Sequence, residues 1–176
     1  MEPLEIVNRL KAKYLNEISV VSQFRDQVFV SVNRDRILDI CRYLHDDPEM
    51  YMDYLADLCG VDYPGRQYRF EVVYNLFSMK HRHRILLKAL IPEKDPAIDS
   101  VVSVWSGANW HEREACDMYG ITFNGHPDLR RILMPEDWDG YPLRKDYPLK
   151  GQEDHEYKGL EEARDLHTHD SEWTIT

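Results

Sequence analysis

The sequence predicts an α+β fold, in which a mainly antiparallel sheet carries packed helices and is followed by a proline-rich, extended C-terminal segment. Three observations favour this class. Stretches that alternate like strands come in blocks, whereas a parallel sheet would interleave each strand with a helix. Other stretches repeat their apolar residues at helical spacing. Residues 121–150 have no regular hydrophobic period and contain four prolines, Pro127, Pro135, Pro142 and Pro148.

The N-terminal part of the chain predicts a helix, a hairpin and a second helix. Residues 4–15 place their apolar side chains at rough helical spacing. Residues 18–23 and 27–32 are rich in β-branched side chains, and the short turn between them indicates a hairpin. Asn33 offers an N-cap for a helix that continues to about His45 and ends before Pro48.

Three further strands are expected at residues 52–62, 68–78 and 83–91. In the second of them, alternation predicts one apolar face and one mostly polar face. The apolar face holds Tyr68, Phe70, Val72, Tyr74 and Leu76, and the polar face holds Arg69, Glu71 and Asn75. Residues 79–82 form the turn that follows. We expect His81 and His83, at this turn, to be surface residues.

Two helices are expected before the proline-rich segment. Residues 98–105 indicate a short one, and residues 110–119 a longer one. Asn109 and Glu112 have the spacing of a capping box at its start, and Gly120 stands where a left-handed C-terminal cap is wanted. Within this helix, Arg113 and Asp117 are four residues apart, so we expect them to pair.

Composition and charge narrow the class of protein. The chain has 176 residues, 43% of them hydrophobic and 31% charged, which is typical of one soluble domain. It has no apolar run long enough to span a bilayer and no signal or transit pattern at its start. We therefore expect a cytosolic protein, or one held on a membrane only through other proteins. The net charge of −10, without a basic stripe, argues against a nucleic-acid partner.

The residues do not predict a reaction centre. His111 and Glu112 begin a zinc-protease pattern, but the second histidine is missing because position 115 is alanine. Glu114 and Asp117 share one exposed helical face, where an ion-pair network is favoured over a catalytic pair. Cys41, Cys59 and Cys116 are too far apart for a cluster, so we expect buried free thiols. We expect neither a cofactor nor a metal in this chain.

The proline-rich segment is the candidate functional region. Residues 121–150 carry five basic and five acidic side chains, and their tryptophan and tyrosines are rigid aromatic anchors of the kind that dominate protein interfaces. We expect this segment to bind a neighbouring protein chain; the alternative is that it only wraps its own domain. The predicted organisation is an α+β domain over residues 1–120, a partner-binding segment over 121–150 and an acidic tail over 151–176.

A longer pattern in this region resembles a known family. Its core is Glu-Arg-Glu, an acid, two apolar or aromatic residues, a histidine, a basic residue and two aliphatics, met here by Glu112, Arg113, Glu114, Asp117, Met118, Tyr119, His126, Arg130, Ile132 and Leu133. Residues 107–110, 131–138 and 142–148 extend the match. The pattern is similar to the 30 kDa-type (C) subunit of the proton-translocating NADH–quinone oxidoreductase, respiratory complex I. Cys116 departs from it, at a free position.

The resemblance implies a non-catalytic subunit of that enzyme, without its own redox centre. The whole complex passes electrons from NADH through FMN and Fe–S clusters to quinone and pumps protons. The implied place is the cytoplasmic side of the bacterial inner membrane, against the quinone-site D subunit and the cluster-bearing B and I subunits. Beside the core residues, the expected interface includes Gly120, Arg131, Trp138, Arg144, Lys145, Asp146 and Tyr147.

Two alternatives remain open at the level of sequence. One is the equivalent subunit of a related membrane-bound hydrogenase or ferredoxin-driven complex, which the partners of the chain would distinguish. The other is a stand-alone metal-dependent hydrolase that uses Glu112, Glu114, Asp117 and His126. Stoichiometric metal in the purified chain, lost together with turnover on Glu114→Ala, would favour that alternative.

Overall fold

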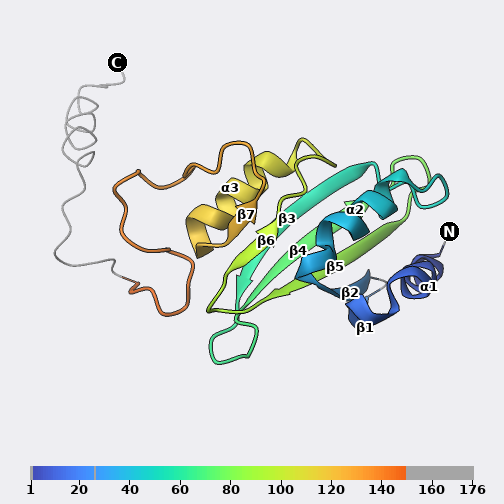
Figure 1. Ribbon diagram of the computed structural model, residues 1–176, viewed down its shortest axis with the longest axis horizontal. Helices are drawn as coiled ribbons and strands as arrows, with labels where there is room; N and C mark the ends of the chain where they lie inside the picture. Colours follow the sequence, from blue (N-terminus) through green and yellow to red (C-terminus); the bar gives the residue numbers. More distant parts are fainter. Residues whose placement is uncertain (1, 26, 150–176) are drawn as a thin grey trace, which may run out of the picture.

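The computed structural model describes residues 2–25 and 27–149 and confirms the predicted class (Figure 1). Five strands form one sheet in the order β1-β2-β5-β4-β3. Neighbouring strands are antiparallel except β2 and β5, which are parallel. The predicted acidic tail, residues 151–176, lies outside the described residues.

The N-terminal helix and hairpin form as predicted. Helix α1 (Pro3–Tyr14) begins with a proline, which suits the first turn because its missing N–H would have no partner there. It buries Ile6, Val7 and Leu10 in the core. A 3₁₀ turn, Leu15–Glu17, leads into β1 (Ile18–Phe24), which pairs with β2 (Gln27–Asn33) as an antiparallel hairpin.

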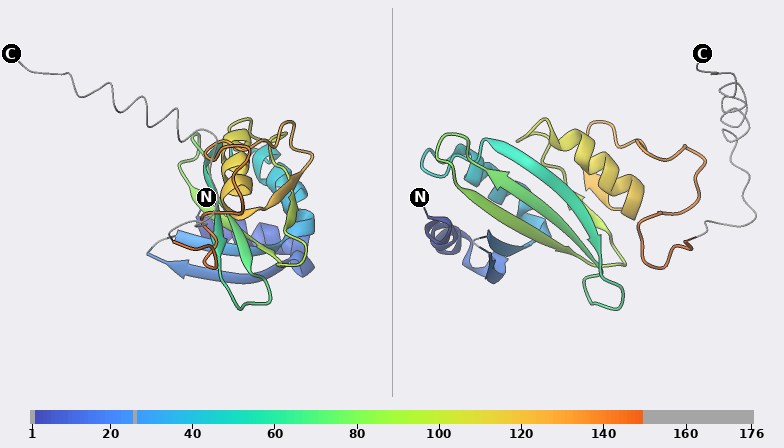
Figure 2. Two further views of the ribbon diagram at one scale, coloured as in Figure 1. Left: turned by 90° about the vertical axis from the view of Figure 1, so that its left-hand side faces the viewer. Right: turned by 180° about the vertical axis from the view of Figure 1, so that it is seen from behind.

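Asn33 caps a short 3₁₀ helix, Arg34–Arg36, by accepting a hydrogen bond from the Asp35 N–H at 3.2 Å. Helix α2 (Ile37–Asp46) follows directly and has an apolar stripe buried in the core. The predicted helix is therefore confirmed, although its α-helical part begins four residues after its cap. Figure 1 shows α2 lying over one face of the sheet, and seen from behind the strands lie in front of it (Figure 2).

The central strands are β3 (Tyr54–Asp62), β4 (Phe70–Phe77) and β5 (Arg84–Ile91). One face of β4 is fully buried, as predicted, and presents Phe70, Val72, Tyr74 and Leu76. Tyr68, predicted on the same face, lies before the strand and is 42% exposed. Arg69 and Glu71, predicted on the other and mostly polar face, are themselves only 5% and 7% exposed, which alternation did not indicate. Both have ionic partners, as a buried charge requires.

His83 and two of the three cysteines also differ from the predicted exposure. His83 is buried, because the loop at residues 48–52 folds over the β4–β5 turn and its Met50 carbonyl lies 2.5 Å from His83 Nε2. Of the three cysteines, only Cys41 is buried as expected. Cys59 is exposed on the edge strand β3, and Cys116 is half-buried on a helix.

The predicted helix at residues 98–105 does not form. Residues Ala97–Asp99 are instead strand β6, which pairs in parallel with β7 (Thr122–Asn124). A single turn follows, in which Val104 and Trp105 donate their backbone N–H groups to the Val101 carbonyl. The reason is tertiary: β7 satisfies the backbone of β6, and the Trp105 indole donates to the Met52 carbonyl at 2.9 Å.

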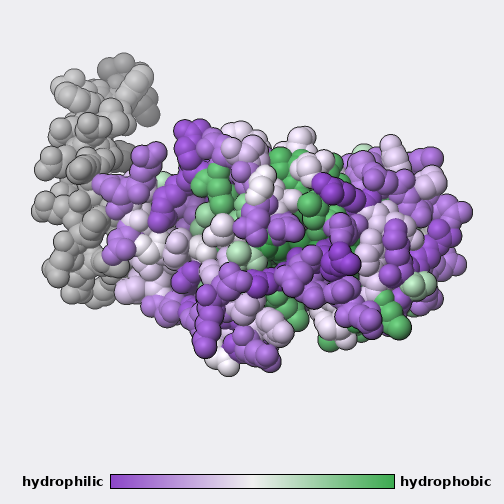
Figure 3. Space-filling model, in the orientation of Figure 1, coloured by the Kyte–Doolittle hydropathy of each residue, from purple (hydrophilic) through white to green (hydrophobic). Residues whose placement is uncertain are grey.

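Helix α3 (Ala108–Tyr119) packs beside β3 and leads into the C-terminal segment. That segment lies at one end of the elongated domain, and the β4–β5 turn lies at the other (Figures 1 and 2). In the view of Figure 3, apolar residues reach the surface mainly in the middle and polar residues cover the end with the β4–β5 turn. Among the described residues, no helix is both long and apolar enough to cross a membrane.

Candidate functional site: helix α3 and the ribbon that follows it

Helix α3 begins differently from the sequence prediction and ends as predicted. Its N-cap is Gly107, without a side-chain cap, so the expected capping box of Asn109 and Glu112 is wrong. At the C-terminus, Gly120 has φ +72° and donates its N–H to the Cys116 carbonyl at 2.8 Å. A Cβ on Gly120 would lie 2.5 Å from the Tyr141 ring, so the site needs glycine for space as well as for conformation.

Glu112 points into the core and fixes the turn after β6. Its side chain is fully buried, and Oε1 accepts a hydrogen bond from the Val101 N–H at 2.7 Å. Burial raises the pKa of the Glu112 carboxyl to about 7, although the Ser100 hydroxyl and the Val101 N–H favour the charged form and offset part of this effect. Glu112 therefore joins α3 to the preceding turn and does not face solvent.

Asp117 anchors the ribbon, by which we mean residues 130–149. Its side chain is fully buried, and Oδ1 accepts a hydrogen bond from Arg131 Nη1 at 2.8 Å. Oδ2 accepts three more from the backbone N–H groups of Ile132, Leu133 and Met134, at 2.8–3.1 Å. Burial alone would raise the pKa of Asp117, but these four donors outweigh it and lower the pKa below its usual range.

Arg113 does not pair with Asp117, contrary to the sequence prediction. Its guanidinium instead donates to the carbonyl oxygens of Arg130 and Arg131, each at 3.0 Å. It also lies 5.2 Å from the centre of the exposed Trp110 ring. Arg113 and Asp117 thus hold the same turn of the ribbon, one through its carbonyl groups and the other through its N–H groups.

Arg131 and Arg144 continue this attachment along the ribbon. Arg131 donates to the carbonyls of Trp138 and Gly140 besides pairing with Asp117. Arg144 Nε donates to the Tyr119 carbonyl at 2.7 Å, and its guanidinium lies 4.4 Å from the centre of the Tyr141 ring. The two arginines therefore close the ribbon into a loop against the end of α3.

A second ionic anchor lies at the β3–β4 end of the sheet. The Arg69 side chain is 7% exposed and forms two hydrogen bonds with Asp62, at 2.8 and 3.1 Å. It also pairs with Glu93 and with Asp146 of the ribbon, at 2.5 and 2.7 Å. The Lys145 N–H donates to Asp62 Oδ2 at 2.7 Å, so charges and backbone fasten the ribbon here together.

The sequence did not indicate Asp62 and Arg69 as parts of this site. Asp62 and Lys145 are 83 residues apart in the chain, and no local pattern relates them. Alternation placed Arg69 on the mostly polar face of its strand and did not indicate that it is buried. The sequence contained one chemical indication of this anchor. An arginine and several acidic residues are present, and their charges need partners if they are buried.

The remaining predicted residues lie around these anchors. Met118 is buried and Tyr119 is half-buried, with its ring over Gly60, where a Cβ would lie 2.6 Å from it. His126 Nδ1 accepts from the Asp128 N–H, and its Nε2 lies 3.2 Å from the Asn109 carbonyl. Arg130 pairs with Asp128 on the surface, and Glu114 is exposed.

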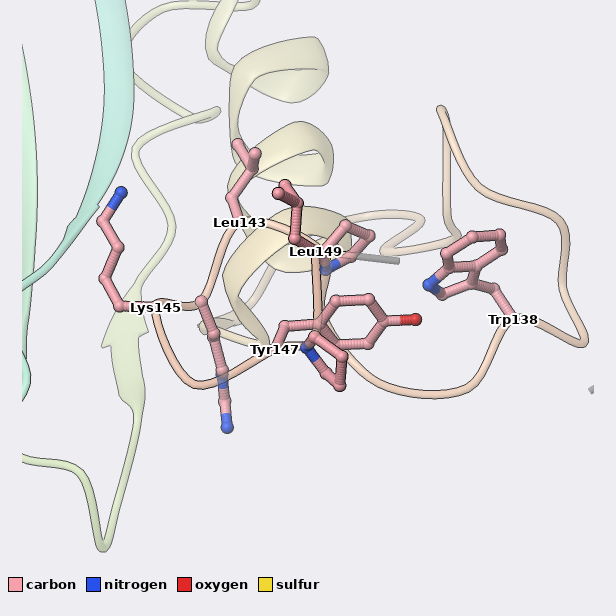
Figure 4. A pocket seen from close by; sticks show the side chains of 8 residues that line it. Trp138, Leu143, Lys145, Tyr147 and Leu149 are labelled. Atoms are coloured by element: carbon pink, nitrogen blue, oxygen red, sulfur yellow. The ribbon is translucent and has the colours of Figure 1, made fainter. Parts of the chain in front are cut away.

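A shallow hollow of about 560 Å³ lies within the ribbon (Figure 4). Its lining residues are Trp138, Pro142, Leu143, Arg144, Lys145, Tyr147, Pro148 and Leu149. The rings of Trp138 and Tyr147 stack with their centres 6.4 Å apart, and the Tyr147 hydroxyl donates to the Asp139 carbonyl. The Lys145 side chain points away from the hollow (Figure 4). The hollow is therefore mostly aromatic and aliphatic.

The arrangement is suited to holding the ribbon against its own domain. Asp117 and Glu112 bond to backbone N–H groups, and Glu114 lies on the surface. In the described part of the chain, no three His, Cys, Asp or Glu side chains gather in a way that could hold a metal ion.

Residues 30–153 match the family model described as the 30 kDa subunit of respiratory-chain NADH dehydrogenase. The NADH-quinone oxidoreductase C subunit of Roseiflexus castenholzii is 52% identical over 84% of this chain and 85% of that protein. The protein of the same name from Geobacter sulfurreducens is 49% identical over 87% of this chain and 94% of that protein.

Two solved structures are similar to this chain in fold. A trypsin-resistant fragment of Nqo5 is 31% identical, with a TM-score of 0.62 over 73% of this chain and all of the fragment. A chain of an archaeal membrane-bound sulfane sulfur reductase shares the fold, with a TM-score of 0.69 over all of this chain and 97% of that one, at 20% identity. From its sequence and its fold, the chain belongs to the family of the 30 kDa subunit of respiratory-chain NADH dehydrogenase.

Proposed function

We propose that this chain is a cofactor-free peripheral-arm subunit of an NADH–quinone oxidoreductase of the complex I type. It holds neighbouring subunits in register while electrons pass from NADH through FMN and Fe–S clusters to quinone. The family match and the relatives named as NADH-quinone oxidoreductase C subunits support the complex; the absence of a catalytic role for this chain is our inference from the site.

One observation carries the proposal. The ribbon is fastened to its own domain by buried ionic anchors at Asp117 and Arg69, yet it turns apolar side chains outward. Leu133 is 57% exposed, Leu143 is 45% exposed and Leu149 is fully exposed. A segment that served only to cover its own domain would bury these residues, because burying a leucine is worth about 2 kcal/mol.

The rigid attachment also has a physical advantage for binding. A flexible segment loses conformational entropy when it docks, and this loss weakens binding. Here Pro142 and Pro148, the Trp138–Tyr147 stack and the two anchors fix the ribbon before any partner arrives. The segment thus wraps its own domain and remains able to bind a neighbour, so the two interpretations of the sequence are compatible.

We infer that the partners are the quinone-site D subunit and the cluster-bearing B and I subunits, as the family resemblance implies. In that arrangement the chain is peripheral on the cytoplasmic side of a bacterial inner membrane, and it contacts the membrane only through the complex. The hydrolase alternative has little support, because Glu112 and Asp117 are buried and bonded to backbone groups.

The test introduces charge at the exposed leucines. The double variant Leu133→Asp/Leu143→Asp should fold with the circular dichroism and Tm of the parent chain, since both side chains are exposed in the isolated domain. It should fail to assemble, and NADH-to-quinone turnover of membranes that contain it should fall. Leu15→Asp is the matched control, because Leu15 is 70% exposed but lies far along the chain in another part of the fold. Full assembly and normal turnover of the double variant would refute the proposal.

The identity of the co-purified proteins separates this function from its nearest alternative. An NADH-binding flavoprotein among them indicates complex I, and a nickel-binding large subunit indicates a membrane-bound hydrogenase. The 49–52% identity to NADH-quinone oxidoreductase subunits favours the first. Flavin or Fe–S absorbance in the purified chain at one equivalent would contradict the cofactor-free assignment.

A further inference from the structure

The turn between β4 and β5 is a basic surface in an acidic protein. Lys80, Arg82 and Arg84, which we call the basic tip, are all exposed. No ion pair joins any of the three to a carboxylate within the described residues. Lys80 and Arg84 lie instead near the rings of Tyr51 and Phe77, 5.5 and 5.8 Å from their centres. Three cations thus face solvent together, although the chain carries a net charge of −10.

The basic tip is held rigidly by the loop at residues 48–53. His81 Nε2 lies 2.9 Å from the Pro48 carbonyl oxygen, and His83 Nε2 lies 2.5 Å from that of Met50. The Met79 N–H donates to Asp53 Oδ1 at 2.8 Å. These contacts fix the backbone that carries the cations, so little entropy remains to be lost when a partner binds them.

Large side chains that are apolar or aromatic are exposed on the same tip and on the loop that holds it. Met79 is 62% exposed, Tyr54 51% and Tyr51 38%. Tyrosine, methionine and arginine are enriched at protein interfaces, whereas a surface that only keeps a protein soluble has no need of exposed methionine and tyrosine. Composition and rigidity therefore both favour a binding surface over a solvated turn.

The position of the basic tip separates it from the ribbon. The two lie at opposite ends of the elongated domain in Figure 1 and in the right-hand view of Figure 2. A protein bound to the ribbon would leave the basic tip open. The tip is therefore available to a second neighbour.

We propose that the basic tip docks a second protein, distinct from the one on the ribbon, through an acidic segment of that protein that also carries apolar side chains. Carboxylates would pair with Lys80, Arg82 and Arg84, and apolar side chains would cover Met79 and Tyr54. A protein partner is favoured over nucleic acid or a lipid surface, because three cations on one turn are few and the remaining negative charge of the chain repels polyanions.

The binding test uses the full chain and a fluorescein-labelled twelve-residue peptide in which glutamate and leucine alternate. The chain should bind this peptide, bind it more weakly as salt increases, and bind poorly to the matched peptide with glutamine in place of glutamate. The triple variant Lys80→Glu/Arg82→Glu/Arg84→Glu should weaken binding roughly tenfold or more. The control triple variant Lys11→Glu/Arg42→Glu/Lys94→Glu has the same charge change at other exposed positions and should bind more tightly than the tip variant.

Two outcomes would overturn the proposal. One is an equal loss of peptide affinity in both triple variants. The other is that the tip binds vesicles of phosphatidylglycerol and phosphatidylcholine but does not bind the peptide. A photo-crosslinking residue at position 82 then tests the assembled complex. A second variant carries the same crosslinking residue at position 143, on the ribbon. The residue at position 82 should form a crosslink with an acidic segment of one protein, and the residue at position 143 should form a crosslink with a different protein. Adding Lys80→Glu/Arg84→Glu should abolish the crosslink from position 82. A product with lipid, or none, contradicts the basic tip while leaving the ribbon product, and hence the proposed function, intact.

Discussion

The Asp117 carboxylate and the Arg131 guanidinium meet at 2.8 Å across fourteen residues of chain, and this pair fixes where the ribbon leaves helix α3. The carboxylate is fully buried and also receives three backbone N–H groups from the turn after Arg131. Because a buried charge is costly without partners, each member of this group depends on the others. The anchor therefore belongs to the folding of the chain as well as to its proposed binding role.

Asp117→Asn tests the energetic weight of this anchor. The amide keeps the size of the carboxylate but loses its charge and one acceptor, so Arg131 and part of the backbone lose their partner. We expect the free energy of unfolding to fall by about 2–4 kcal/mol, measured by urea denaturation. Glu114→Gln, on the exposed face of the same helix, should change it by less than about 0.5 kcal/mol. Similar losses in the two variants would rule out the anchor.

Arg69→Met tests the second anchor through its pH dependence. Burial works against ionised Asp62, but Arg69 and the Lys145 N–H outweigh it and lower the pKa of Asp62; hydrogen bonding to Arg69 likewise lowers the pKa of Asp146. Groups with lowered pKa values add stability above their unfolded pKa of about 3.9, and that stability is lost as the pH falls through their folded pKa.

The variant should therefore be less stable at pH 7 and should lose less further stability on acidification below about pH 4 than the parent chain. Urea denaturation between pH 2.5 and 7 measures both effects. Arg66→Met is the control, since Arg66 is exposed and its nearest carboxylate oxygen, on Glu71, is 3.8 Å away. If the free energy of unfolding fell equally with pH below about pH 4 in the parent chain and in Arg69→Met, the lowered pKa values of Asp62 and Asp146 would not be due to Arg69.

Gly120→Ala should be more harmful than Gly125→Ala. Both glycines have positive φ, +72° and +77°, so an L side chain is strained by about 1 kcal/mol or more at either position. At Gly120 a Cβ would also lie 2.5 Å from the Tyr141 ring, whereas at Gly125 it meets open space. We expect the free energy of unfolding, measured by thermal denaturation, to fall by about 2–4 kcal/mol for Gly120→Ala and by about 1 kcal/mol for Gly125→Ala. Equal losses would mean that Tyr141 moves aside without cost.

Glu112→Gln should remove a pH dependence near neutrality. Burial raises the pKa of Glu112 to about 7 in the folded chain, above the value of about 4.3 expected when unfolded. The folded state then binds more protons between these values, so the contribution of Glu112 to stability is full below about pH 4 and decreases as the pH rises through 7. Glutamine keeps an acceptor for the Val101 N–H and does not titrate.

The measurement is the free energy of unfolding at pH 5, 6.5 and 8. Relative to the parent chain, the glutamine variant should gain stability steadily across this series, whatever its absolute level at pH 5. A constant difference between the two proteins would show that Glu112 does not titrate in this range.

The elements of this protein that local periodicity encodes were predictable. Alternation in residues 70–76 follows from a sheet with one buried face, and it placed β4 correctly. Gly120 was identifiable as a C-cap because a helix end in the left-handed region favours glycine. The helix at residues 98–105 was predicted wrongly because its first residues pair with β7, more than twenty positions further along the chain.

The sequence by itself determined the α+β class, the approximate ends of α1, α2 and α3, and a stiff segment rich in interface residues. Only the tertiary structure decided what its charges do: that Glu112 faces Val101, that Asp117 pairs with Arg131 and not with Arg113, and that Arg69 holds the ribbon. Helical and strand periods arise from backbone geometry within a few residues. The partner of a buried charge is selected by whichever groups packing brings within about 3 Å, and no short stretch of sequence records that choice.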